Sequence, residues 1–442
     1  MAEKLLVSKY TYLFISSNGE KLVYNSRTNA FLEVNRELYD KLQDYKQKNQ
    51  AVKELEDDIV ESLYSRKILV KKEEDEDFLL EMQYETDRRS YSKYIMGLTI
   101  VPTLGCNFSC HYCFEEKKRS ISMTEEVEDA LITFINAHKE SQKLNLNWYG
   151  GEPLLAFNTI ERLLNKISEK TTLELNRHTL ITNGYFINDK VISLFKKYPL
   201  DIIQITLDGN RERHNSIRKM KNDSNTYERI LKNMECILHE FPNIQIHVRV
   251  NIERKNVKDY FEVAQEFKNR WNDKRLVVYP GFLRLDNETK TAYNCDSLDK
   301  QEIAELMFEL RDKNIIDFPV YPQLQLAKTC SANRQCAYIV GPEGEIYKCW
   351  NDVSDSTKIV GYIQNNKITN KPLLSRYIVA SKWYNDSKCK ECFFLPICNG
   401  TCSWYVLRNK YMNGKYNLCT CIQKAPGMLD KCLEYYYNLQ KK

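Results

Sequence analysis

The sequence predicts an α/β fold in which six parallel strands and the helices between them form a partial barrel. Short apolar runs alternate with longer amphipathic segments from residue 95 onward, which is typical of parallel strands joined by right-handed crossovers. Cysteine and glycine motifs follow these runs, as expected where sites form at the carboxyl ends of parallel strands. The predicted strands are Ile95–Val101, Leu144–Tyr149, His178–Ile181, Ile202–Leu207, Ile244–Val250 and Leu276–Val278, and the predicted helices are Thr124–Ala137, one from about Asn158, Lys190–Lys197, Tyr227–Glu240 and Val257–Asn269.

Length and charge limit the kinds of protein that this chain can be. Its 442 residues have room for two or three domains, at roughly one domain per ~150 residues. The net charge of +5, from 65 basic and 60 acidic residues, predicts neither nucleic acid nor a membrane as partner. No apolar run reaches the ~18 residues of a membrane span, and the first residues, MAEKLLVSKYTYLF, contain no signal-peptide core. We therefore expect a cytoplasmic protein.

The N-terminal segment, residues 1–70, predicts a small α+β unit. A turn at Ser16–Gly19 separates the first two strands, as in a hairpin. We expect the charged run Lys71–Asp77 to be solvated, at the start of a linker that comprises residues 71–94. The predicted elements of the unit are strands Tyr12–Ile15, Lys21–Tyr24 and Ala30–Val34, helices Arg36–Tyr45 and Val52–Leu63, and the extended run Ile68–Val70.

The chain has 15 cysteines, none of them in residues 1–105. Clustered cysteines in a chain that is not secreted favour metal binding over disulfides. Cys106, Cys110 and Cys113 lie on one short loop directly after the first predicted barrel strand. Three thiolates would leave one iron of a [4Fe–4S] cluster open to bind a small molecule. On spacing alone, part of a zinc site is an alternative.

With Tyr112 just before its last cysteine, this loop resembles that of the radical S-adenosylmethionine (SAM) superfamily. The resemblance implies that the open iron binds the amino and carboxylate groups of SAM. An electron from the cluster then splits SAM and leaves a 5′-deoxyadenosyl radical. The backbone at Tyr112 is expected near adenine.

Further motifs at predicted strand ends resemble the same superfamily. The run Gly150–Pro153 resembles the GGEP motif, which contacts the SAM amino group. Thr206 stands where relatives have a hydroxyl that helps to hold SAM, and Arg218 is either a partner of the SAM carboxylate or a structural arginine. The residues that the resemblance assigns to the cofactor are Tyr112, Gly150, Gly151, Glu152, Pro153, Thr206 and Arg218.

A second group of cysteines occupies the C-terminal third and resembles the SPASM extension of radical SAM enzymes. The resemblance implies two auxiliary [4Fe–4S] clusters, hence three clusters in all. Cys421 is an alternative to Cys419, and zinc ribbons are an alternative to both clusters. The first auxiliary set is Cys330, Cys336, Cys349 and Cys402, and the second is Cys389, Cys392, Cys398 and Cys419.

The whole chain resembles radical SAM enzymes that modify ribosomally made peptides. The run LVYNSRTNAFLEVN resembles their winged-helix recognition element, which binds a leader peptide along a sheet edge; a structural cap is the alternative. The implied reaction is a thioether or carbon–carbon crosslink in a precursor peptide, with a flavodoxin- or ferredoxin-type protein as reductant. The implied domains are residues 1–70 for recognition, 95–310 for the barrel and 311–442 for the SPASM extension.

Two other functions are considered. Anaerobic sulfatase maturases, which form formylglycine, share this core and carry an aspartate directly after the third SPASM cysteine. Here Trp350 follows Cys349, and the nearest carboxylate is Asp352, so the catalytic base stays unassigned. A zinc-stabilised peptide-binding protein without catalysis is the non-enzyme alternative.

Overall fold

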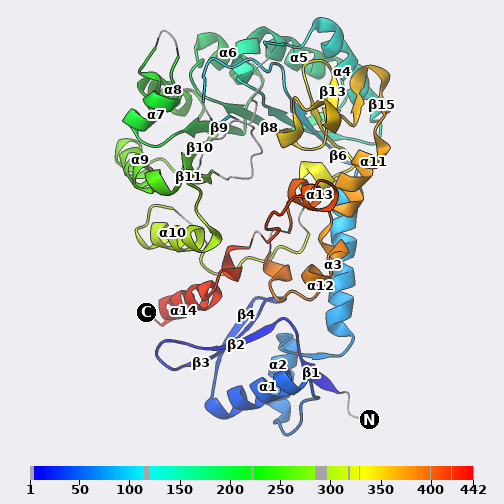
Figure 1. Cartoon of the computed structure of the whole chain (residues 1–442), viewed down its shortest axis with the longest axis vertical. Coiled ribbons are helices and arrows are strands. Elements are labelled where there is room, and N and C mark those ends of the chain that lie inside the picture. The colour runs from blue at the N-terminus through cyan, green and yellow to red at the C-terminus, as the bar shows by residue number, and fades with distance from the viewer. Residues whose placement is uncertain are drawn as a thin grey trace. The chain divides into compact units, whose positions relative to one another are not determined.

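The computed structural model describes residues 4–110, 112–113, 120–220, 223–283, 296–316, 319–327, 329–398, 400–419 and 421–441 (Figure 1). The chain divides into two compact units, each built from segments that are distant in sequence. The first unit comprises Met1–Tyr91, Asp299–Cys330 and Val379–Lys442, and the second comprises Ser92–Leu298 and Ser331–Ile378.

The second unit contains the predicted parallel sheet. Six strands lie in the order β11-β10-β9-β8-β7-β6, and every neighbouring pair among them is parallel. The predicted α/β fold with an open parallel sheet is therefore confirmed, with strand ends that differ by a few residues. The strands are β6 (Ile95–Ile100), β7 (Lys143–Trp148), β8 (Glu174–Thr182), β9 (Ile202–Leu207), β10 (Gln245–Ile252) and β11 (Leu276–Phe282).

Helices between these strands cover one face of the sheet (Figure 1). Alternate residues of the central strands are fully buried, for example Ile203, Ile205 and Leu207 in β9. Thr124 caps the first helix by accepting a hydrogen bond from the Val127 backbone N–H, as the sequence predicted. The helices are α4 (Glu125–Ala137), α5 (Phe157–Lys170), α6 (Asp189–Lys197), α7 (Arg211–Ile217), α8 (Thr226–Glu240) and α9 (Val257–Arg270).

Part of the cysteine-rich segment extends this same sheet. Strand β12 pairs in parallel with β6, and the Gly97 N–H donates to the Cys336 carbonyl at 2.9 Å. Strands β13, β14 and β15 then add in antiparallel pairs. The sheet thus continues beyond β6, the strand that leads into the cysteine loop. The predicted domain limits thus differ from the observed units, because residues 331–378 pack with the barrel strands. These elements are β12 (Ala337–Val340), β13 (Glu345–Tyr347), β14 (Gly361–Tyr362), β15 (Lys367–Ile368) and α11 (Lys371–Ser375).

The first unit contains the three predicted N-terminal strands as an antiparallel sheet in the order β2-β3-β4, with β4 at one edge. Strands β1 and β5 form a separate antiparallel pair. The elements are β1 (Leu5–Val7), β2 (Thr11–Ile15), β3 (Lys21–Asn25), β4 (Ala30–Val34), α1 (Arg36–Lys48), α2 (Asp57–Ser65) and β5 (Leu69–Lys71), followed later by α10 (Lys300–Asp312), α12 (Ser387–Lys390), α13 (Ser403–Tyr411) and α14 (Met428–Gln440).

The expected solvated linker is wrong for most of its length, because α3 (Glu74–Tyr91) occupies it. Within its charged start, Asp75 is buried and accepts hydrogen bonds from the Ser8 hydroxyl at 2.9 Å and the Lys9 backbone N–H. Phe78 and Met82 of the same helix pack in an apolar cluster with Tyr10. The acidic residues at its start suggested a solvated segment, but they belong to a helix with one buried face.

The N-terminal sheet shares its core with the end of the chain. Phe14, Leu22 and Tyr24 pack against Leu429 and Leu433 of α14. One apolar cluster of residues 1–70 is therefore shared with α14, while a second, around Val23, Leu42 and Leu63, lies wholly within residues 1–70. None of the helices in the described ranges combines the length and apolar character needed to cross a bilayer.

Candidate functional site

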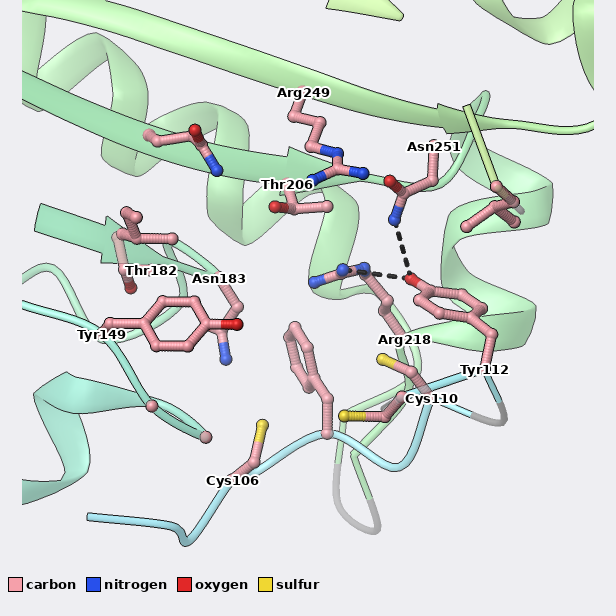
Figure 2. Close-up of a pocket in the computed structure, with 17 residues that line it drawn as sticks. Cys106, Cys110, Tyr112, Tyr149, Thr182, Asn183, Thr206, Arg218, Arg249 and Asn251 are labelled. Atoms are coloured by element: carbon pink, nitrogen blue, oxygen red, sulfur yellow. Dashed lines mark hydrogen bonds between the residues drawn. The ribbon is translucent and has the colours of Figure 1, made fainter. Parts of the chain in front are cut away.

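A cavity of about 210 Å³ opens where the parallel strands of the second unit end (Figure 2). The cysteine loop forms one side, and residues from β8, β9 and β10 form the opposite side. Thiols, glycine backbone, hydroxyls, amides and guanidinium groups meet there. The lining residues are Cys106, Phe108, Cys110, Tyr112, Cys113, Tyr149, Gly150, Gly151, Ile181, Thr182, Asn183, Gln204, Thr206, Arg218, Arg249, Asn251 and Leu283.

The three cysteines of the first motif all line this cavity. Their loop leaves the end of β6 and is fixed by its own turns. The Gly105 N–H donates to the Thr103 hydroxyl at 3.0 Å, and the Cys113 N–H donates to the Cys110 carbonyl at 3.2 Å. Within the described residues, no three His, Cys, Asp or Glu side chains are grouped so as to hold a single metal ion. Residues 111 and 114–119 of this loop lie outside the described residues.

The two glycines of the GGEP motif bring the end of β7 against the cysteine loop. A Cβ on Gly150, whose φ is +134°, would lie 2.4 Å from the Thr103 carbonyl oxygen, and one on Gly151 would lie 2.2 Å from the Gly105 oxygen. Only glycine permits this contact without displacing backbone. The requirement for glycine at both positions is thus set by the neighbouring loop, while both residues also line the cavity.

Glu152 lies behind the cavity wall and joins two strand ends. Its fully buried carboxylate accepts hydrogen bonds from the Thr182 hydroxyl (2.7 Å), the Asn183 N–H (2.7 Å) and the Leu154 N–H (3.0 Å). Burial raises the pKa of Glu152 despite these donors. The predicted contact with a SAM amino group stays a prediction, since all three of these partners belong to the protein. Pro153 is buried beside it.

Tyr112 and Arg218 meet in a buried polar network centred on Asp208. The Arg218 Nε donates to Asp208 Oδ2 at 2.6 Å, and the Tyr112 hydroxyl donates to the same oxygen. Asn251 Nδ2 donates to Asp208 Oδ1 at 2.9 Å and to the Tyr112 oxygen at 3.2 Å, while Arg218 Nη2 donates to that oxygen at 3.1 Å (Figure 2). Arg218 is therefore largely occupied by protein partners.

The charges of this network are matched. Burial alone would raise the pKa of Asp208, yet the Arg218 guanidinium and the hydrogen bonds hold it below its usual value. Burial raises the pKa of Tyr112. His214 packs beside the network, where burial and the charge of Arg218 lower its pKa to about 3. The network thus holds a neutral tyrosine and histidine around one ion pair.

Three polar lining residues, Gln204, Arg249 and Asn251, were not singled out from the sequence. Gln204 and Thr206 alternate along β9, and Arg249 and Asn251 alternate along β10. Residues two apart in a strand share a face, and the intervening residues are buried aliphatics. Polar side chains at every second position near a strand's carboxyl end are therefore the signal that would have identified Gln204, Arg249 and Asn251.

Trp350 does not line the cavity but contacts Tyr149, which does. Its ring contacts that of Tyr149, with centroids 5.7 Å apart, and the indole is 47% exposed. Asp352, the nearest carboxylate in sequence, is buried and accepts a hydrogen bond from the Tyr377 hydroxyl at 2.5 Å. It does not line the cavity, so it is not placed as a base there.

The second predicted auxiliary set lies within the first unit. Burial and the neighbouring charges of Asp386 and of the other three thiols raise the pKa of Cys389 to about 12. The Lys424 Nζ lies 3.4 Å from the Cys419 sulfur and 3.8 Å from that of Cys392. Cys421 is buried and hydrogen-bonded to Cys398, so both alternatives for the fourth ligand are close to this set.

The first predicted auxiliary set is divided between the units. Cys330 and Cys402 belong to the first unit, and Cys336 and Cys349 to the second. Within the first unit, the Cys330 sulfur lies 3.9 Å from the hydroxyl of Ser403, the residue after Cys402.

Comparisons with known proteins identify relatives among radical SAM proteins. Residues 100–266 match the Radical SAM superfamily. The radical SAM cyclopropyl synthase TigE of Paramaledivibacter caminithermalis is 23% identical, over 94% of this chain and 93% of that protein. A cysteine-type anaerobic sulfatase-maturating enzyme of Clostridium novyi is 24% identical, over 70% of this chain and 86% of that enzyme.

Solved structures share the fold. Streptococcus suis SuiB bound to precursor peptide SuiA has a TM-score of 0.55 and 13% identity, covering 94% of this chain and all of that one. The enzyme anSMEcpe with bound AdoMet and Cp18Cys peptide has a TM-score of 0.61 and 19% identity, covering 78% of this chain and 99% of that one. At these identities the likeness shows the fold.

Proposed function

Because residues 100–266 form a radical SAM domain, we propose that this chain installs a crosslink, thioether or carbon–carbon, in a ribosomally made precursor peptide. The observation that carries the proposal is the extent of the likeness. TigE and SuiB, a cyclopropyl synthase and a structure bound to a precursor peptide, each match over 94% of this chain. The sulfatase-maturating enzymes match over 70–78% of it.

The residues at the cavity fit a cluster with an open iron and SAM. Cys106, Cys110 and Cys113 supply three thiols on one side, and hydroxyl, amide and guanidinium groups face them. When bound, the cluster and SAM supply the radical that removes a hydrogen atom from the peptide. The chain's own part is to hold the cofactor and substrate in place: the backbone of Gly150 and Gly151 borders the cofactor site, and Arg218 and Tyr112 order its wall.

The C-terminal cysteines supply two further sets of four thiols. Fully ligated clusters have no open iron, so their role in this proposal is to accept the surplus electron, while a flavodoxin- or ferredoxin-type protein serves as the reductant. In the second set, Cys421 is buried against Cys398, whereas Cys419 is exposed beside Lys424. Both thiols stay candidates for its fourth ligand.

The N-terminal sheet is proposed to bind the leader peptide at β4, which among the described strands pairs only with β3. Phe31 and Glu33 of β4 contact the C-terminal helix: the Phe31 ring lies 6.2 Å from that of Tyr437, and the Tyr437 hydroxyl donates to Glu33 at 2.7 Å. Deleting residues 1–70 would open this shared core. Amide hydrogen exchange is therefore the better test: adding precursor should slow exchange in Ala30–Val34 but not in the other edge strand, Thr11–Ile15. Unchanged exchange in β4 would exclude strand addition there.

The second candidate is sulfatase maturation, favoured by the matches to sulfatase-maturating enzymes. Against it, Trp350 stands in place of the expected aspartate, and Asp352 is buried on Tyr377. The experiment that separates the two uses anaerobically reconstituted protein, SAM and a reductant. One arm contains peptides encoded beside the gene and the other a sulfatase-derived cysteine peptide. We expect loss of two hydrogens per crosslink in the first arm. Formylglycine in the second arm alone would overturn the proposal.

A further inference from the structure

Arg249 differs from the other arginine in the cavity because no described residue provides a counter-ion for it. It projects from the middle of β10 into the cavity (Figure 2). Its Nε is buried and has no hydrogen-bond partner among the described residues. Arg218, by contrast, is paired with Asp208. No aspartate or glutamate is among the described residues that line the cavity.

The neighbouring strand leaves space for this guanidinium. Gly281 of β11 pairs in register with Asn251 of β10. A Cβ on Gly281 would lie 2.3 Å from Arg249 Nε and 2.8 Å from Asn251 Oδ1. That Asn251 oxygen is also buried and without a partner among the described residues. A donor, Arg249 Nε, and an acceptor, Asn251 Oδ1, thus both lie over this glycine, and neither has a hydrogen-bond partner in the part of the chain that the structure describes.

An arginine stays charged in any protein environment, and removing it from water without a partner costs free energy. Its planar fork matches a carboxylate, which it binds through two parallel hydrogen bonds. We propose that Arg249 binds a carboxylate of the peptide substrate, from an aspartate or glutamate side chain or from the peptide's C-terminus. This inference rests on the proposed function and names a chemical feature of its substrate.

The position of Arg249 decides between the two sources of a carboxylate. SAM has one anionic group, and that group is expected at the open iron beside the cysteines. Arg249 lies across the cavity from Cys106 and Cys110, with Arg218 between them (Figure 2). The adenosine part of SAM is uncharged. An anion that reaches Arg249 therefore comes from the second ligand, the peptide.

The test measures peptide binding by anaerobic equilibrium dialysis of the reconstituted protein with SAM. The probes are two synthetic pools, Ac-X-X-Asp-X-X-NH2 and Ac-X-X-Asn-X-X-NH2, counted by mass spectrometry. We expect the protein to retain the acidic pool about tenfold over the amide pool, Arg249→Gln to abolish this preference and Arg249→Lys to reduce it. Arg177→Gln, which removes an exposed arginine of β8, is the matched control and should keep the preference. Gly281→Ala, which crowds Arg249 while leaving its charge, should also lower it.

Binding of SAM and of 5′-methylthioadenosine, which has no carboxylate, is measured on the same samples. Retained SAM with no acidic preference in the wild-type protein would overturn this inference and leave the proposed function standing. Loss of SAM but not of methylthioadenosine in Arg249→Gln would assign the carboxylate to SAM, which also overturns it. If the wild-type protein retains no SAM, the proposed function fails and the inference with it. Melting curves and iron content show whether each variant is folded.

Discussion

The cysteine loop after β6 and the C-terminal cysteines differ in how the fold holds them. The loop belongs to one unit, and the ends of β6 and β7 fix it through backbone contacts at Gly150 and Gly151. Of the four cysteines predicted for the first auxiliary set, Cys330 and Cys402 belong to one unit and Cys336 and Cys349 to the other. The barrel loop thus depends on local folding, whereas the predicted auxiliary ligands come from segments that are far apart in the sequence. Metal binding contributes folding free energy, so we expect the two regions to respond differently to mutation.

The largest effect should come from removing the barrel thiols. Changing Cys106, Cys110 and Cys113 together to alanine should lower iron from about twelve to about eight per chain, at four irons per cluster. Release of 5′-deoxyadenosine should stop, because no open iron is left to bind SAM. Iron analysis and chromatography after anaerobic reconstitution measure both. Stoichiometric zinc with almost no iron in the unmutated protein would refute the cluster assignment itself.

A single substitution among the C-terminal cysteines should affect more than the one cluster to which that cysteine is assigned. Cys402 stands at the N-cap position of α13 and lies four residues after Cys398 of the second predicted auxiliary set. Cys402→Ala should therefore disturb both auxiliary clusters and leave about four irons per chain, while SAM cleavage without peptide survives. Cys336→Ala, in the other unit, is the matched control and should remove only one cluster. If both variants lose the same iron, or if Cys402→Ala still crosslinks at wild-type rate, the coupling is absent.

The third change tests the support of the barrel loop. Asp208→Asn leaves the buried Arg218 without its counter-charge, which should cost about 3–5 kcal/mol of unfolding free energy. Tyr112→Phe removes only a hydroxyl from the same network and should cost about 1–2 kcal/mol. Denaturant unfolding under anaerobic conditions gives both values. Equal losses in the two variants would mean that the ion pair does not dominate the network.

The sequence predicted the parallel strands, the cysteine loop and the glycine motif because each is local. Apolar runs specify strands, and three cysteines on one loop need no distant partner. It did not predict that Glu152 accepts hydrogen bonds from Thr182 and Asn183, or that Arg249 packs against Gly281. These contacts join separate strands. The helix at Glu74–Tyr91 was missed because its buried face is narrow and its first turn is entirely acidic. Pairing across strands and burial of isolated charges depend on tertiary structure.

The smallest expected effect is a difference between the two units in how their stability depends on pH. All six histidines of the chain lie in the second unit, and the first has none. His178 of β8 is fully buried; its Nε2 accepts from the Trp148 indole at 2.8 Å, and its Nδ1 lies 3.0 Å from the Pro199 carbonyl. Burial lowers the pKa of His178 to about 4, against about 6.5 when unfolded.

Between these two values the unfolded chain binds more protons than the folded one, so stability falls as the pH falls from 6.5 to 4 and levels off below. His178 alone accounts for at most about 3 kcal/mol of this loss, at 1.36 kcal/mol per pKa unit. Hydrogen exchange at pH 7, 6 and 5, corrected for the intrinsic rate, should therefore show earlier opening of β8 and β9 than of β2 and β3. His178→Gln, which keeps an acceptor for Trp148, should reduce the slope without removing it, because His214 remains buried with its pKa also lowered. If β2 and β3 lose protection as steeply as β8, the acid sensitivity does not come from the histidines, and the two units unfold as one.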